Sequence, residues 1–291
     1  MLAFNHLGRL GYLANQMFQY AAIKGISEHN NIEYMIPENS QMQLFDGFKM
    51  KTATKIRGFL GDVSILDGRG APVGCTIKTE TGFDFDENLF NNPPSETSLY
   101  GFFQSEKYFV DIKDDIINDF TFKDEILEPC LEFISQITSF YGKTVSLHIR
   151  RGDYLTNSAN HYNLTLDWYQ KAIEKFPNHI VLIFSDDIEW CKSQSIFEPD
   201  RFMFSETKDG KIVRSDGRWD SSNMDHWYDL CLQSLCDDNI ISNSTFSWWA
   251  AYLNKNSDKT VISPDPSKMW FGPNNAHLNT KDLIPDSWVI L

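Results

Sequence analysis

The chain has 291 residues, with 26 Lys and Arg against 40 Asp and Glu, so its formal net charge at pH 7 is −14. This balance excludes general binding to DNA or RNA, because affinity for those polymers comes from basic side chains that neutralise phosphates. A hydrophobic fraction of 42% and 22 Phe exclude a disordered chain and supply a sizeable core. The length fits one large domain or two modest ones.

The five cysteines are widely spaced and none forms a CxxC pair. We therefore expect reduced, buried thiols, and neither a zinc site nor a disulfide framework. The N-terminus lacks the basic start and apolar run of a signal peptide, and no segment approaches the ~18–20 apolar residues of a membrane span. These patterns predict a cytoplasmic protein without a transmembrane segment. The oligomeric state has no signature in the sequence.

The N-terminal half alternates short apolar strands with helical patterns. The predicted elements are a strand at 2–4, a helix over 13–29, a strand at 32–36, a strand at 99–103 and a helix over 106–120. Residues 38–96 are rich in Gly, Asn and Asp and have no long periodic run. The acidic stretch 111–128 is expected to be a solvated helical face. We expect residues 1–135 to form an α/β domain with irregular insertions.

The C-terminal half gives a clearer alternation. The predicted elements are a strand at 144–149, a helix over 166–176 capped by Thr165, a strand at 180–184, a helix over 187–195, a strand at 201–204, a helix over 225–235, a strand at 239–242, a helix over 246–253 and a strand at 260–262. Short, continuously apolar strands are typical of a parallel sheet covered on both faces. We expect a doubly wound α/β domain over residues 136–291.

Polar side chains follow three of these strands. Arg150 and Arg151 come after the first, Asp186 and Asp187 after the second, and the run 243–245 after the fourth. In open α/β sheets, ligands bind beyond the carboxyl ends of the strands, so we expect these groups to share one edge. Each group taken alone is more often a surface ion pair or a helix cap.

The residue types indicate a nucleoside diphosphate site. The Arg150 or Arg151 guanidinium can hold a phosphate bidentately. Ser244 and Thr245 open a helix, where free backbone N–H groups favour an anion. Asp186 or Asp187 can accept from two donors at once, such as those of guanine or of a ribose. The pattern is not a P-loop, because no Gly-Lys-Ser/Thr follows a glycine-rich loop.

Four blocks resemble signatures of the α-1,2-fucosyltransferases, glycosyltransferase family 11. They are Asn15-Gln16-Met17-Phe18-Gln19-Tyr20-Ala21, Phe103-Gln104-Ser105-Glu106-Lys107-Tyr108-Phe109, His148-Ile149-Arg150-Arg151-Gly152-Asp153-Tyr154 and Asn243-Ser244-Thr245-Phe246-Ser247-Trp248-Trp249. They occur in the family's order and span most of the chain. In the family, a Gly-x-Leu/Phe-Gly run leads directly into Asn-Gln, whereas here Tyr12-Leu13-Ala14 separates Gly11 from Asn15.

The resemblance implies a GT-B-like fold of two Rossmann-like domains with mostly parallel sheets, the N-terminal one on the acceptor side. It implies an inverting, metal-independent galactoside α-1,2-fucosyltransferase that uses GDP-β-L-fucose as donor, a galactose-terminated glycan as acceptor and no cofactor. By the same analogy Arg150 would hold the β-phosphate with Ser244 and Thr245, Asp186 or Asp187 would read the guanine, and Phe246 would line the base pocket. Asn15 and Gln16 would reach the site from the N-terminal domain.

The general base stays open between the nearby candidates His148 and Asp153; His148 could equally be structural, and Asp153 could orient an arginine. Two other functions also stay open: a nucleotide- or glycan-binding module without catalysis, and a transferase of another nucleotide sugar. The sequence does not indicate which glycan is the acceptor. Contacts with the acceptor would come from segments 38–96, 206–223 and 268–278, and none of these contains a recognisable motif. Because the chain is acidic, we expect the donor site to be a small positive island around Arg150 and Arg151.

Overall fold

The computed structural model describes residues 1–37, 42–50, 58–198, 200–205, 207–208, 211–212 and 225–291. The chain divides into two compact units. The first holds Met1–Thr121 and Leu278–Pro285, and the second holds Phe122–His277 and Asp286–Leu291. The boundary expected between residues 135 and 136 falls inside one continuous helix, α5 (Asp124–Tyr141), whose apolar side packs on α9 (Asp225–Leu235) within the second unit.

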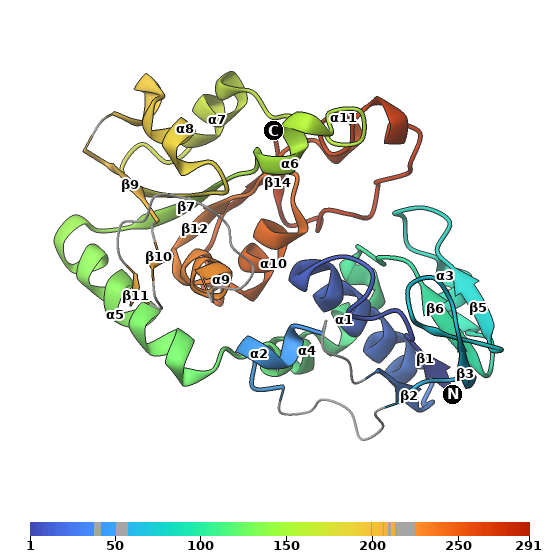
Figure 1. The fold of residues 1–291 in the computed structure, drawn as a ribbon. Helices are drawn as coiled ribbons and strands as arrows, with labels where there is room; N and C mark the ends of the chain where they lie inside the picture. Colours follow the sequence, from blue (N-terminus) through green and yellow to red (C-terminus); the bar gives the residue numbers. More distant parts are fainter. Residues whose placement is uncertain (38–41, 51–57, 199, 206, 209–210, 213–224) are drawn as a thin grey trace. The chain divides into compact units, whose positions relative to one another are not determined.

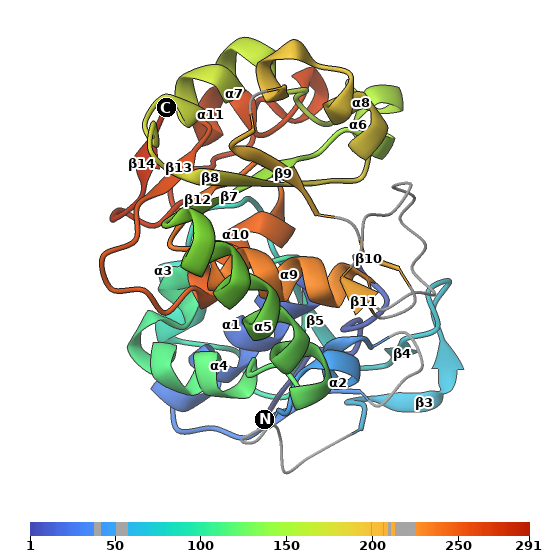
Figure 2. The ribbon, with the colours of Figure 1, turned by 90° about the vertical axis from the view of Figure 1, so that its left-hand side faces the viewer.

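The second unit is built on a six-stranded parallel sheet (Figures 1 and 2). Its strands are β7 (Thr144–Ile149), β8 (Ile180–Ser185), β9 (Phe202–Phe204), β12 (Asp238–Ile240), β13 (Val261–Ser263) and β14 (Val289–Ile290). They lie in the order β14-β13-β12-β7-β8-β9. Every residue of β7 and β8 is buried, as a parallel sheet covered on both faces requires.

The strand order reverses between β7 and β12. From β7 the chain proceeds outward to β8 and β9, and it then returns to place β12, β13 and β14 on the other side of β7. Doubly wound sheets bind ligands at such a reversal, outside the carboxyl ends of the two strands. The topology therefore puts the candidate site directly after Ile149 and Ile240.

Helices cover both faces of this sheet. Besides α5 and α9, the helices of this unit are α6 (Gly152–Thr156), α7 (Leu166–Ile173), α8 (Ile188–Lys192), α10 (Thr245–Leu253) and α11 (Pro266–Met269). The unit also has two 3-10 turns, η3 (Ser195–Phe197) and η4 (Pro273–Asn275), and a small antiparallel pair of strands, β10 (Thr207–Lys208) and β11 (Lys211–Ile212). α7 and α8 lie on one face, and α9 and α10 lie on the other (Figures 1 and 2). Trp248 and Trp249 of α10 are fully buried, and Thr165 caps α7, as predicted.

The first unit has a smaller parallel sheet, in the order β2-β1-β6-β5. Its strands are β1 (Leu2–Ala3), β2 (Tyr34–Met35), β5 (Thr76–Thr79) and β6 (Thr97–Tyr100), and β3 (Asp62–Leu66) and β4 (Pro72–Val73) form a separate antiparallel pair. Its helices are α1 (Leu13–His29), α2 (Leu44–Gly47), α3 (Glu87–Asn91) and α4 (Lys113–Asp119), with 3-10 turns η1 (Glu106–Tyr108) and η2 (Val110–Ile112). The first two predicted strands and the helix over 13–29 are thus confirmed.

Three predictions in this unit were wrong in detail. The strand expected at 99–103 ends at Tyr100, because the chain turns at Gly101, and the helix expected over 106–120 is broken into η1, η2 and α4. Asp119 does not belong to a solvated face: it is fully buried, and its carboxylate lies 2.6 Å from the Nζ of Lys24, which α1 carries into the core. Burying both charges is tolerable because they pair and because the Tyr20 hydroxyl also donates to Asp119 at 2.8 Å.

Candidate nucleotide-sugar site

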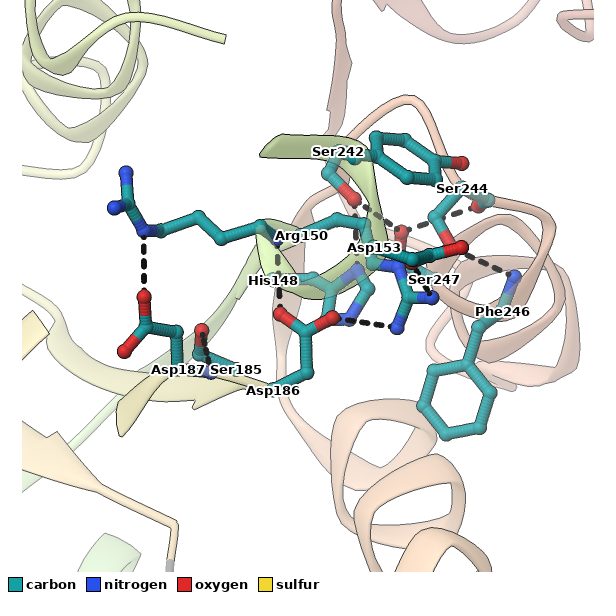
Figure 3. A network of polar contacts seen from close by, with 12 residues as sticks. His148, Arg150, Asp153, Ser185, Asp186, Asp187, Ser242, Ser244, Phe246 and Ser247 are labelled. Atoms are coloured by element: carbon teal, nitrogen blue, oxygen red, sulfur yellow. Dashed lines mark hydrogen bonds and ion pairs between the residues drawn. The ribbon is translucent and has the colours of Figure 1, made fainter. Parts of the chain in front are cut away.

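Arg150 stands at the strand reversal, immediately after β7. Its guanidinium lies 2.6 Å from Oδ2 of Asp186, which follows β8, and it also pairs with Asp153 of α6 (Figure 3). The guanidinium carbon lies 5.3 Å from the ring centre of Tyr154. Three groups therefore fix the direction of this cation at the carboxyl edge of the sheet, as predicted.

Asp186 organises the turn that follows β7. Its Oδ1 accepts the backbone N–H of Arg151 at 2.9 Å. The approach is so close that a Cβ on Gly152 would overlap with Oδ2 of Asp186, so any other residue there would require the Asp186 carboxylate to move. Burial raises the pKa of Asp186, and the nearby Arg150 charge and the backbone N–H groups oppose that rise. The carboxylate thus acts as a fixed anchor for Arg150.

Arg151 is held in a different way from Arg150. Its Nε donates to Asp187 at 2.9 Å, and its guanidinium carbon lies only 3.6 Å from the ring centre of Trp190. Asp187 also caps α8 by accepting the N–H of Trp190. Through these two contacts the Arg151 side chain links the end of β7 to α8, which is a structural role. Arg150 is therefore the better candidate for a direct phosphate contact.

The helix α10 begins on the other side of the reversal. Ser244 is its N-cap, with Oγ accepting the N–H of Phe246, and Thr245 is its first residue. Asn243 is buried and its amide donates to the carbonyls of Tyr162 and Trp270 at 2.8 and 3.0 Å. The first turn of α10 thus lies where an anion would be favoured, while the Asn243 side chain holds two neighbouring loops.

His148 lies under the site in the interior. It is 4% exposed, its Nδ1 lies 2.8 Å from Oγ of Ser242, and its ring centre lies 5.7 Å from that of Phe246. Burial, with the neighbouring Arg150 charge, lowers the pKa of His148 to about 3. A neutral imidazole with Nδ1 already engaged supports the strand end. Asp153, by contrast, keeps 62% of its side chain exposed.

The charge balance of this cluster differs from the expected positive island. Two guanidiniums face three carboxylates, those of Asp153, Asp186 and Asp187. The arginines are therefore neutralised by their neighbours and do not form a free cationic patch. A phosphate that binds Arg150 would either displace Asp153 or Asp186 from the guanidinium or use its remaining N–H donors beside them.

Asn15 and Gln16 belong to the first unit, in the first turn of α1. The extra residues start the helix early, at Leu13. Asn15 Oδ1 accepts from Nε2 of Gln104 at 3.1 Å, and the buried Gln16 accepts the N–H of Gln43 at 2.8 Å. Both amides are thus built into the carboxyl-edge region of the first unit's sheet, where β6 leads into Gln104.

Several residues that shape the site have no role that the sequence predicts. Gly152 and Tyr154 lie in a quoted motif, yet only the structure shows the close approach to Asp186 and the Tyr154 hydroxyl donating to the Asn243 carbonyl at 3.1 Å. Trp190 and Ser242 carry no local signal, because their partners are far away in the sequence. The segment 206–223, expected to contact an acceptor, lies largely outside the described residues, as do parts of 38–96.

Within the described ranges, no group of three or more His, Cys, Asp or Glu side chains has the arrangement of a metal site. The five cysteines are free thiols, and burial is confirmed for four of them. None of the helices in the described part of the chain has the length and apolar character needed to cross a bilayer.

The fold belongs to the GT-B-like class: two Rossmann-like α/β units with mostly parallel sheets. It is similar to the solved fucosyltransferase NodZ from Bradyrhizobium, with a TM-score of 0.51 at 14% identity over 96% of this chain and 97% of that one. A variant of Arabidopsis thaliana FUT1 in complex with GDP also gives a TM-score of 0.51, at 10% identity over 91% of this chain and 70% of that one. At sequence identities this low, the similarity supports the fold and not a shared function.

The profile of the Glycosyl transferase family 11 matches residues 83–279, and the chain belongs to this family. It is 33% identical to the O-antigen biosynthesis glycosyltransferase WbnK of Escherichia coli, over 66% of this chain and 60% of that relative's length. It is 28% identical to an alpha-1,2-colitosyltransferase of Escherichia coli over 96% of both chains. A galactoside alpha-(1,2)-fucosyltransferase 2 of Hylobates lar is 23% identical, over 87% of this chain and 69% of its own.

Proposed function

We propose that this glycosyltransferase moves L-fucose from GDP-β-L-fucose to the 2-hydroxyl of a terminal galactose, with inversion and without a metal ion or cofactor. The observation that carries the proposal is the position of Arg150 directly after β7, at the strand reversal on whose other side the chain runs from β12 into α10. The family relatives named for α-1,2 transfer support the linkage.

The chemistry asks for stabilisation of a leaving group. Cleavage of the bond between fucose and GDP develops negative charge on the departing diphosphate. A guanidinium preorganised by Asp186, together with the N–H groups at the start of α10, can stabilise that charge without reorganising during the reaction. This arrangement does the work that a metal ion does in other transferases, so the proposal needs none.

The acceptor hydroxyl must lose a proton as it attacks. Of the two residues considered as bases, His148 is buried with Nδ1 engaged, whereas the Asp153 carboxylate is largely exposed beside Arg150. We therefore propose Asp153 rather than His148 as the side chain that takes the proton. When a diphosphate displaces Asp153 from Arg150, its carboxylate becomes available to the acceptor.

A second donor has a specific observation in its favour, because the relative that covers nearly the whole chain is a colitosyltransferase. Colitose lacks a ring hydroxyl that fucose has, so the two donors differ by one polar group. The described residues offer no contact that separates them. A direct comparison of donors therefore decides between fucose and colitose.

The deciding experiment incubates the full chain with lactose and each of three donors: GDP-fucose, the corresponding colitose donor and GDP-mannose. Release of GDP is measured with and without lactose and with EDTA, and NMR of the product gives the linkage and anomeric configuration. We expect lactose-dependent release from GDP-fucose, unaffected by EDTA, and an α-1,2-linked fucose. Binding of GDP-fucose without any release would favour a binding module, and preferred release from another donor would reassign the sugar.

A further inference from the structure

A strained turn follows β6 in the first unit. Phe103 has a φ of 54°, in the left-handed region that bulky side chains rarely adopt, and its ring is fully buried. Gly101, two residues earlier, has a φ of 155°. Such a backbone persists only where its surroundings hold it in place.

Glu80, which directly follows β5, supplies that hold. One carboxylate oxygen accepts the N–H of Phe102 at 2.6 Å and the other accepts the N–H of Phe103 at 2.8 Å. A Cβ on Gly101 would overlap with the Glu80 Cβ, so the glycine leaves room for the carboxylate. The sequence offers no hint of this, because Glu80 stands outside every recognised motif.

The turn leads directly into Gln104, whose Nε2 donates to Asn15 at 3.1 Å. We propose that Glu80 is a positioning residue of the enzyme: its ionised carboxylate holds the turn at 102–103, and the turn holds Gln104 against Asn15. The inference rests on the proposed function, because it takes Asn15 to serve the transfer reaction.

The hold depends on the charge state of Glu80. A carboxylate can accept both N–H groups, whereas a protonated carboxyl has one good acceptor oxygen and a hydroxyl that cannot accept equally well. Burial raises the pKa of Glu80 to about 7, the two backbone N–H groups oppose the rise, and Asp84 adds to it. The charged and titratable groups around it are Asp84 with its partner Lys281, Asp86 with its partner Lys78, and Tyr108, whose hydroxyl accepts the N–H of Asp86.

Glu80→Gln tests the inference, with Glu87→Gln on the exposed start of α3 as the matched control. In the variant an amide NH₂ faces one of the two N–H groups. We expect kcat for transfer to lactose at pH 8 to fall about 10-fold, with little change in the KM for GDP-fucose, because the donor site is not touched. The kcat of the unmodified chain should fall between pH 8 and pH 6 with a midpoint near 7, and Glu80→Gln should lack that step.

Hydrogen–deuterium exchange gives a readout that needs no activity and also reports a failure to fold. At pH 8, peptides covering 101–105 should exchange faster in Glu80→Gln than in the unmodified chain and in Glu87→Gln. Unchanged exchange there, or wild-type kcat with the same pH step, would overturn the role of Glu80. If the unmodified chain transfers no fucose at all, the proposed function fails, and the exchange measurement still decides whether Glu80 holds the turn.

Discussion

The two parallel sheets present their polar strand ends in different ways. In the second unit, charged side chains pair across neighbouring strands, as Arg150 does with Asp186 and Arg151 with Asp187. In the first unit, a neutral pair, Asn15 and Gln104, is supported by a carboxylate that accepts backbone N–H groups. The first arrangement suits a charged diphosphate, and the second suits the hydroxyl groups of a sugar.

The difference also concerns what holds each edge in place. Long, fully buried strands fix the second unit's edge, so the turn after β7 starts from a rigid base. In the first unit β1 has two residues and β5 is mostly exposed, and a single strained turn carries the polar group instead. Substitutions at the two edges should therefore fail in different ways: loss of leaving-group stabilisation in one, and loss of orientation in the other.

The largest effect is expected for Arg150→Ala. Removing one preorganised donor to a developing anion typically lowers the rate by about 10²–10³-fold, and we expect that loss in kcat for fucosyl transfer. Arg150→Lys should recover only part of it, because an ammonium group cannot make a bidentate contact. Initial rates of GDP release measure both, and near-normal turnover by Arg150→Ala would refute the site assignment.

A smaller effect is expected for Gly152→Ala. The added Cβ would overlap with Oδ2 of Asp186, so the carboxylate has to move and Arg150 loses its anchor. We expect kcat to fall on the order of 10-fold, a typical result of sub-ångström misplacement. The matched control is Gly68→Ala in the first unit, where an added Cβ meets nothing within 4 Å. Equal kcat values for the two variants would show that the Asp186 anchor does not matter.

The last effect concerns stability rather than rate: a pH dependence of unfolding that comes from the first unit. The folded pKa of Glu80 is about 7, above its ordinary value of 4.5, so between these values the folded state binds more protons than the unfolded state. Stability from this group is therefore greatest below pH 4.5 and is lost as the pH rises to 7, by about 1–3 kcal/mol. Urea unfolding of Glu80→Gln, compared with the unmodified chain at pH 5.5 and 8, should lack this component; identical pH dependence would contradict it.

The second unit could be predicted well from sequence because its signals are local. Fully apolar strands indicate β7 and β8, and the rule that ligands lie at carboxyl ends brings Arg150 and Asp186 together from the sequence alone. The pairing of each arginine with an acid, and hence the absence of a positive island among these residues, could not be predicted. It depends on contacts between segments about 35 residues apart in the chain.

The first unit could be predicted only in outline. The pattern over 13–29 predicts the helix but not that α1 is buried on nearly all sides. That burial arises from tertiary packing. The pairing of Lys24 with Asp119 could not be predicted either, because Asp119 stands in an acidic stretch that is typical of an exposed face. The turn at 102–103 has the apolar pattern of a strand end, because nothing local shows that Glu80 accepts its N–H groups. Local sequence patterns do not predict polar contacts of this kind, because the partners lie far apart in the chain.

Whether the edge after β7 binds the diphosphate is tested most directly by the affinity for GDP, measured by isothermal titration calorimetry for the unmodified chain, Arg150→Ala and Asn15→Ala. We expect Arg150→Ala to weaken GDP binding by about 10–100-fold, the value of a charged hydrogen-bonded contact. Asn15→Ala should bind GDP as the unmodified chain does while losing transfer activity. Unchanged GDP affinity in Arg150→Ala would contradict the claim that the edge after β7 binds the diphosphate.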